Sequence, residues 1–189
     1  EECLAELRDP NDRRFGYPFI ACTHCGPRYT MITGLPYDRA NTTMLDFPLC
    51  PACLAEYTDP GSRRFHAQPT ACAECGPSLS MPVAEVAAAL SVGRIVAIKG
   101  VGGYHLACDA ANATAVDTLR ERKRRGTKPF AVMVRDLTAA ARIVELDPAV
   151  DALLTNPARP IVVLAVRCSP AALDVAGAVA PGTGTLGVM

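Results

Sequence analysis

Seven of the nine cysteines in this 189-residue chain form one pattern that occurs twice. Two thiolates separated by two residues converge on one point when the chain turns between them, and two such pairs surround a tetrahedral Zn²⁺. A shell closed by four thiolates leaves no position for water, so its role is structural. We therefore predict two structural zinc sites, whose ligands are Cys3, Cys22 and Cys25 in the first copy and Cys50, Cys53, Cys72 and Cys75 in the second.

The repeat extends beyond the cysteines. A shift of fifty positions also aligns Leu-Ala-Glu at 4–6 with 54–56 and Arg-Arg-Phe at 13–15 with 63–65. The equivalent of Cys50 would lie one residue before Glu1, so we expect a piece of a longer protein that begins inside the first site. A disulfide framework is the alternative. The regular CxxC spacing and the Ala/Val-rich remainder of the chain favour metal sites and a reducing, cytoplasmic compartment.

Four residues near the cysteines carry further expectations. Gly26 and Gly76 follow the second pair of each copy, and we expect them to let the backbone turn its amides toward the sulfurs. We expect His24 and His66 to have hydrogen-bonding or surface roles, because four sulfurs per site already complete the ligand set.

The two Arg-Arg-Phe segments allow two interpretations. They could bind nucleic acid through cations and an aromatic stack, or they could hold the finger units against each other or against a neighbouring domain. Interleaved acidic residues and a formal net charge of zero favour the second interpretation and argue against a general nucleic-acid or membrane-surface binder. The chain also has no apolar run near the roughly 20 residues of a membrane span.

The composition of the chain changes near residues 77–83, where a sequence rich in Pro and Cys becomes rich in Ala, Val and Leu. We predict a truncated first finger at 1–30, a linker and second finger at 31–80, and a mixed α/β domain at 81–189 that holds the main core. Cys108 and Cys168 should be buried apolar residues of that domain. Expected helices cover 83–92, 112–125 with Asn112 as its cap, 136–144 with Asp136 as its cap, and a segment that starts at Asp147-Pro148. Expected strands cover 94–98, which should be buried, 105–108, 130–134 and 160–166.

Two basic segments of the α/β domain could bind an anion. Lys99 ends a strand and enters a glycine-rich loop at 100–103, which either brings backbone amides to an anion or is a tight structural turn. Residues 120–128 carry six basic side chains at a helix C-terminus. Some of these should be solvated, but Lys123, Arg125 and Lys128 could share a pocket for a triphosphate or a carboxylate.

The motifs together resemble the HypF family of [NiFe]-hydrogenase maturation carbamoyltransferases. The resemblance is carried by Thr-His-Cys-Gly-Pro at 23–27, Leu-Pro-Tyr-Asp-Arg at 35–39, Asp-Phe-Pro-Leu-Cys at 46–50 and Arg-Arg-Phe-His-Ala-Gln-Pro at 63–69. The segments at 99–110 and 128–133 are similar to the family's YrdC-like domain. The resemblance therefore implies tandem four-cysteine zinc fingers followed by a partial YrdC-like mixed α/β domain.

The resemblance also implies the chemistry. In that family carbamoyl phosphate is cleaved to carbamate, the YrdC-like domain adenylates the carbamate with ATP and Mg²⁺, and the carbamoyl group passes to the C-terminal cysteine of HypE. Lys123-Arg124-Arg125 matches the family's Lys-x-Arg motif, and Lys99 lies where the first pocket strand ends. Lys128 completes the expected nucleotide-binding set. No catalytic nucleophile is implied. The family's Ser-x-Asn motif is not present before Met189, so we expect this piece to be inactive by itself.

Two other functions remain open. The first is a zinc-ribbon module that binds RNA or a protein partner, with an α/β domain that only recognises shape. The second is an enzyme similar to threonylcarbamoyl-AMP synthase, whose family shares the YrdC-like fold but typically lacks the fingers.

Overall fold

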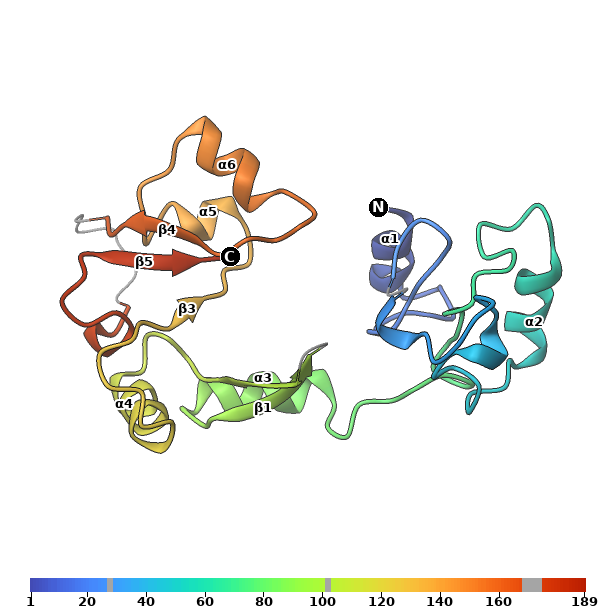
Figure 1. Ribbon diagram of the computed structural model, residues 1–189, viewed down its shortest axis with the longest axis horizontal. Coiled ribbons are helices and arrows are strands. Elements are labelled where there is room, and N and C mark those ends of the chain that lie inside the picture. Colours follow the sequence, from blue (N-terminus) through green and yellow to red (C-terminus); the bar gives the residue numbers. More distant parts are fainter. Residues whose placement is uncertain (27–28, 101–102, 168–174) are drawn as a thin grey trace. The chain divides into compact units, whose positions relative to one another are not determined.

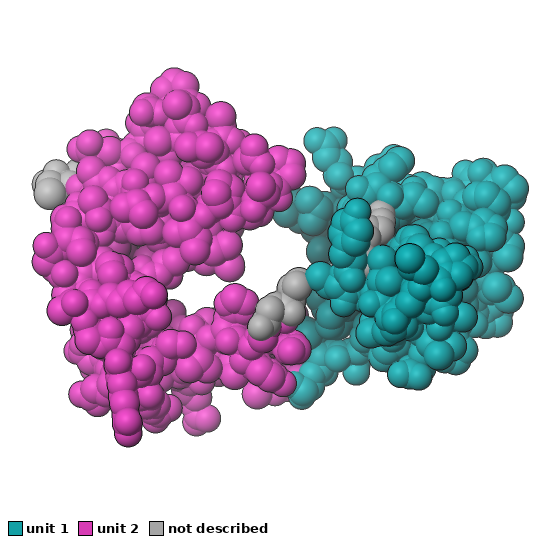
Figure 2. Space-filling model, in the orientation of Figure 1, with its two compact units in different colours: residues 1–80 teal, residues 81–189 magenta. Residues whose placement is uncertain are grey.

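The computed structural model describes residues 1–26, 29–100, 103–167 and 175–189. It divides into two compact units, residues 1–80 (unit 1) and residues 81–189 (unit 2), which Figure 2 distinguishes by colour. Cys168 and the middle of the glycine-rich loop lie outside the described residues. No helix in these described segments is long and apolar enough to cross a membrane.

Unit 1 has little regular structure. Its helices are α1 (Glu2–Arg8) and α2 (Pro51–Thr58), which occupy equivalent places in the two copies and which the sequence had not predicted. Two single 3₁₀ turns, η1 (Tyr29–Met31) and η2 (Arg39–Asn41), lie in the linker between the copies. A small apolar cluster packs the linker on the fingers and consists of Tyr17, Met31, Met44 and Ala71.

The linker is fixed to the second copy by Arg39. Its guanidinium donates hydrogen bonds to three backbone carbonyls, at 2.7 Å to Gln68, 2.8 Å to Thr70 and 2.6 Å to Phe47. Backbone carbonyls without a partner are costly to bury, so this one side chain compensates for the missing secondary structure around it.

Unit 2 contains two separate sheets (Figure 1). An antiparallel hairpin comprises β1 (Val96–Gly100) and β2 (Gly103–Ala107). The second sheet has the order β3-β5-β4, in which the central β5 is parallel to β3 and antiparallel to β4. Its strands are β3 (Ala131–Val132), β4 (Val162–Ala165) and β5 (Thr185–Val188). The predicted mixed α/β arrangement of the domain is therefore confirmed.

Three of the four helices described in unit 2 begin at a side-chain cap. The four helices are α3 (Val83–Ser91), α4 (Ala113–Arg122), α5 (Leu137–Ala140) and α6 (Pro148–Leu154), with the single 3₁₀ turn η3 (Gly177–Val179) before β5. The side-chain oxygens of Asn112, Asp136 and Asp147 accept hydrogen bonds of 2.8–3.0 Å from backbone N–H groups of the first turn. These side chains satisfy amide donors that a helix leaves unpaired at its start.

The main core lies in unit 2, as predicted, around the three-stranded sheet. Its most buried side chains include Val116 of α4, Val144, and Leu186 and Val188 of β5. Cys108 is partly buried against this core, which suits the predicted role of a small apolar residue.

Three expectations were wrong in detail. The strand predicted at 94–98 lies two residues later, and its central residues are exposed, because no residue of the adjacent helix α3 is buried and the hairpin has only two strands. Helix α4 ends at Arg122 rather than near Arg125, since Arg124 takes a positive φ of 47°. Helix α5 ends at Ala140, after which Val144 forms a bridge with Val166.

Candidate functional site

The second cysteine cluster is formed by one helix and one loop. Cys50 is the N-cap of α2 and Cys53 lies in its first turn, while Cys72 and Cys75 come from the following loop. The four Sγ atoms lie within 4.8 Å of one another, with Cys72 Sγ at 3.8 Å from both Cys50 Sγ and Cys75 Sγ. A tetrahedron with Zn–S bonds of about 2.3 Å has S···S edges of about 3.8 Å. The sulfurs are therefore close enough together to bind one zinc ion.

The first cluster repeats this geometry with three sulfurs in the described chain. Cys3 of α1 lies 3.5 Å from Cys25 by their Sγ atoms, and Cys22 Sγ lies 3.7 Å from Cys25 Sγ. None of the described cysteines forms a disulfide. These distances again match the edges of a zinc tetrahedron.

The surroundings shift the thiol pKa values of the second cluster in opposite directions. Burial raises the pKa of Cys72, but backbone N–H donors of Glu74 and Cys75 outweigh it and lower that pKa to about 7. Burial dominates at Cys53 and raises its pKa to about 12, although the neighbouring Arg13 opposes the shift. A thiol with this pKa is protonated at pH 7, and it loses its proton when it binds a metal ion.

Each cluster receives an arginine from the other copy. Both terminal nitrogens of Arg13 lie 3.4 Å from Cys53 Sγ, and Arg63 Nη1 lies 3.0 Å from Cys3 Sγ. Arg13 also pairs with Glu56 of α2 at 2.7 Å, and Arg63 pairs with Glu6 of α1. The two contacts are equivalent under the fifty-residue shift.

The adjacent arginines, Arg14 and Arg64, are buried and complete this arrangement. Arg14 Nε donates to the carbonyl of Ala71 at 2.9 Å, and Arg64 Nε donates to the carbonyl of Ala21 at 3.0 Å, in each case directly before a ligand cysteine of the other copy. Their guanidinium groups also pair with the same two glutamates. We call this set the arginine clasp; it comprises Arg13, Arg14, Arg63 and Arg64 with Glu6 and Glu56.

The arginine clasp distinguishes the two interpretations of the Arg-Arg-Phe segments. The guanidinium groups are occupied inside unit 1 and do not form a cationic surface. Phe15 and Phe65 remain exposed, at 55% and 37%. The contacts match the interpretation in which these segments hold the finger units together.

The glycines and histidines beside the clusters have separate roles. Gly26 has a positive φ of 86°, as expected of a turn after a cysteine pair. Gly76 has no positive φ, and glycine is needed there because there is no room for a side chain. A Cβ at this position would lie 2.1 Å from the Tyr17 hydroxyl and 2.5 Å from Ala71 Cβ. His24 and His66 are exposed and belong to neither cluster of potential ligands.

The basic segment after α4 is an ordered turn. Arg120 donates to the carbonyls of Gly126 and Lys128, and Arg125 donates to the carbonyls of Lys128 and Pro129. Both guanidinium carbons also lie within 5 Å of the centre of the Phe130 ring, at 4.8 and 4.7 Å. Arg120 and Arg125 therefore shape the turn.

The other predicted cations are exposed and do not all converge. Lys123 and Lys128 are exposed at the two ends of the basic turn. Lys99 lies in the hairpin, where its Nζ is 5.3 Å from the centre of the Tyr104 ring. No contact between described residues joins Lys99 to the basic turn.

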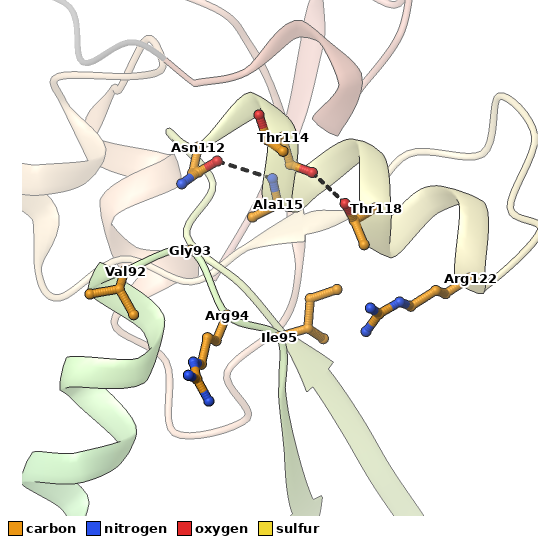
Figure 3. A pocket seen from close by; sticks show the side chains of 9 residues that line it. All are labelled: Val92, Gly93, Arg94, Ile95, Asn112, Thr114, Ala115, Thr118 and Arg122. Atoms are coloured by element: carbon orange, nitrogen blue, oxygen red, sulfur yellow. Dashed lines mark hydrogen bonds between the residues drawn. The ribbon is translucent and has the colours of Figure 1, made fainter.

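A separate hollow of about 540 Å³ lies between the α3–β1 turn and α4 (Figure 3). Arg94 and Arg122 reach its two sides with Ile95 between them, while Asn112 and Thr118 are hydrogen-bonded to helix backbone. None of Lys99, Lys123, Arg125 and Lys128 lines this hollow.

The sequence did not reveal that Arg13 and Arg63 donate to cysteine sulfurs, or that Arg94 and Arg122 line one hollow. The repeat gave a partial indication of the arginine contacts, because Glu6 and Glu56 recur at the same fifty-residue spacing as the arginine pairs. Which copy each arginine contacts depends on how the chain folds back, and the spacing does not contain that information.

Known proteins are similar to nearly the whole chain. The HypF finger family model matches residues 1–32 and 49–81, and the Sua5/YciO/YrdC family model, described as "Telomere recombination", matches residues 88–189. "Carbamoyltransferase HypF" of Rhizobium leguminosarum bv. viciae is 57% identical over 187 residues, covering 99% of this chain and 24% of that protein. "Carbamoyltransferase HypF2" of Cupriavidus necator is 59% identical over 200 residues, covering 100% and 24%.

Solved structures agree with these similarities. A crystal structure of full-length HypF in its phosphate- and nucleotide-bound form matches with a TM-score of 0.92 and 49% identity, covering 100% of this chain and 26% of that chain. The chain thus spans about a quarter of the length of the relatives it matches. The finger match and the two cysteine clusters together support zinc binding.

Proposed function

The chain belongs to the HypF family, and from this premise we propose that it is the zinc-finger and nucleotide-binding portion of a carbamoyltransferase. In this proposal unit 1 is a scaffold and unit 2 carries the chemistry. The scaffold role of unit 1 is supported by the geometry of the second cluster, because its four sulfurs leave no open coordination position on a zinc ion.

The proposed zinc ligands are the seven repeated cysteines. The S···S distances of 3.5–3.8 Å support both sites, and the arginine clasp supplies hydrogen-bond donors to the sulfurs. A zinc ion in each site takes the place of the hydrophobic core that unit 1 lacks. The regular CxxC spacing suits a reducing compartment, and we propose the cytoplasm.

For unit 2 we propose adenylation of carbamate by ATP. Carbamate, released from carbamoyl phosphate, attacks the α-phosphorus through an oxygen; the bond to the bridging oxygen breaks, and pyrophosphate leaves with the electron pair. Negative charge develops on the phosphoryl oxygens, and fixed cations stabilise it without a protein nucleophile. Mg²⁺ would neutralise charge on the triphosphate when it is bound.

The proposed nucleotide-binding residues are Lys99, Lys123, Arg125 and Lys128. Lys123 and Lys128 support this role because they are exposed on a turn that Arg125 orders through the carbonyls of Lys128 and Pro129. A related HypF structure is nucleotide-bound, which supports nucleotide binding by this chain. The carbamoyl group would then pass to the C-terminal cysteine of HypE, the proposed acceptor protein.

The two alternative functions have less support. An RNA-binding module would need free cations beside Phe15 and Phe65, whereas Arg14 and Arg64 are buried in ion pairs. An enzyme similar to threonylcarbamoyl-AMP synthase would share the family match over residues 88–189 but would not explain the finger match.

The test is carbamoyl-phosphate-dependent exchange of pyrophosphate into ATP by a full-length protein that contains this chain. Lys123→Ala alone and Lys123→Ala with Arg125→Ala should both slow the exchange, because each removes positive charge from the proposed pocket. Arg135→Ala is the matched control, since its side chain is 87% exposed in the same unit. Exchange by both variants at the rate of the control would remove these residues from the site.

A further inference from the structure

We propose that the two cysteine clusters form one coupled metal centre, in which each zinc site is supported by an arginine of the other finger. The inference rests on the zinc binding proposed above and adds a dependence of each site on the opposite copy. Its basis is the exchanged contact pattern: Arg13 of the first copy donates to Cys53, and Arg63 of the second copy donates to Cys3.

Each supporting arginine is held by the helix that carries its cysteine. Cys53 and Glu56 are three residues apart on α2, so their side chains lie on one face, and Arg13 bridges them. Arg63 bridges Cys3 and Glu6 of α1 in the same way. The carboxylate orients the guanidinium so that its N–H groups face the sulfur.

Charge gives these contacts their effect. Four thiolates around Zn²⁺ carry a net charge of −2, and the sulfurs retain most of it. A guanidinium donating to a ligand sulfur offsets that charge and favours the metallated state, in the same way as other hydrogen-bond partners of metal ligands. Removing such a partner typically lowers metal affinity about 10–100-fold.

Backbone contacts link zinc binding at one cluster to zinc binding at the other. Arg14, next to Arg13, donates to the carbonyl of Ala71, whose neighbour Cys72 is a ligand of the second cluster. Arg64, next to Arg63, donates to the carbonyl of Ala21, whose neighbour Cys22 is a ligand of the first. A metal that fixes one finger therefore fixes the arginines that support the other, so zinc binding at the two sites should be positively cooperative.

The experiment measures zinc release from each cluster separately in a full-length protein that contains this chain. Zinc-loaded protein is titrated with a strong zinc chelator while released thiols are alkylated, and mass spectrometry identifies which cysteines react. The variants are Arg13→Gln and Arg63→Gln, whose side chains are partly exposed at 33% and 20%. Arg8→Gln, an exposed arginine at the end of α1, is the control.

We expect an exchanged pattern. Arg13→Gln should release zinc from Cys50, Cys53, Cys72 and Cys75 at about 10–100-fold lower chelator concentration and change the first cluster less. Arg63→Gln should do the reverse, and Arg8→Gln should leave both unchanged. Cys22→Ser, which damages the first cluster, should also promote release from the second. Circular dichroism at saturating zinc checks that each variant folds.

Two results would overturn the inference. The first is that each arginine variant changes zinc release from the cluster of its own copy, from both clusters equally, or from neither. The exchanged support would then not exist, although the zinc sites themselves would stand. If the unsubstituted chain holds no zinc at either cluster, both this inference and the proposed metal sites are wrong.

Discussion

Replacing Arg14 with alanine should lower the free energy of unfolding of unit 1 by about 2–4 kcal/mol. The Arg14 side chain is 1% exposed and bonds the carbonyl of Ala71 at 2.9 Å and both carboxylate oxygens of Glu56. Removing one partner of a buried ion pair costs about 3–5 kcal/mol, because the other charge is left unpaired. Glu56 is 28% exposed and keeps Arg13, so we expect less than this full cost.

Intrinsic tyrosine fluorescence during urea unfolding would measure this change. The chain has no tryptophan and five tyrosines, and four of these lie in unit 1, at positions 17, 29, 37 and 57. The signal therefore reports mainly on the fingers, and saturating zinc keeps metal loss out of the comparison. The control Arg8→Ala should change the free energy of unfolding by no more than about 0.5 kcal/mol, as exposed substitutions usually do. If Arg14→Ala matches that control, the arginine clasp does not stabilise unit 1 and our reasoning about it is refuted.

Three further predictions concern unit 1. Burial raises the pKa of Glu6, but Arg64 and Arg63 outweigh it and lower the pKa from 4.5 to about 2. The stability advantage of the native chain over Glu6→Gln should therefore be complete above pH 4.5 and disappear as the pH falls to about 2, in an acid titration of both proteins; an advantage independent of pH would contradict this. Gly76→Ala should destabilise unit 1 by about 1–3 kcal/mol in the urea assay, because its Cβ would overlap Tyr17 and Ala71, whereas Gly34→Ala, with its nearest neighbour atom at 4.0 Å, should not. Zinc chelation should make residues 1–80 sensitive to protease and leave residues 81–189 protected, as peptide mapping would show. Equal digestion of both units would mean that the stabilisation by zinc is not confined to unit 1.

The sequence predicts local features of the fold well. Asn112, Asp136 and Asp147 cap helices as expected, because the interaction of a cap with the first turn needs no partner distant in the sequence. The spacing of the cysteines likewise predicts which sulfurs gather, since two turns in the chain are enough to bring each CxxC pair together.

Features that depend on tertiary contacts were not predictable in this way. The central strand β5 was not predicted, although its buried Leu186 and Val188 alternate with the less buried Thr185 and Gly187. Val188 is fully buried because β3 and β4 pair with β5 on its two sides. The arginine pairs were recognised as repeated, but their exchange between the copies depends on the folding of the whole of unit 1. The exposure of β1 was missed for the same reason, because a strand-like apolar run does not say how many layers will cover it.

X-ray absorption at the zinc edge of the purified chain tests most directly whether the fingers are closed structural metal sites. We predict bound zinc with a first shell dominated by sulfur at about 2.3 Å, because the described clusters offer three and four thiolates and no histidine. A shell dominated by nitrogen or oxygen, or a chain that holds no zinc while its cysteines remain reduced, would contradict it.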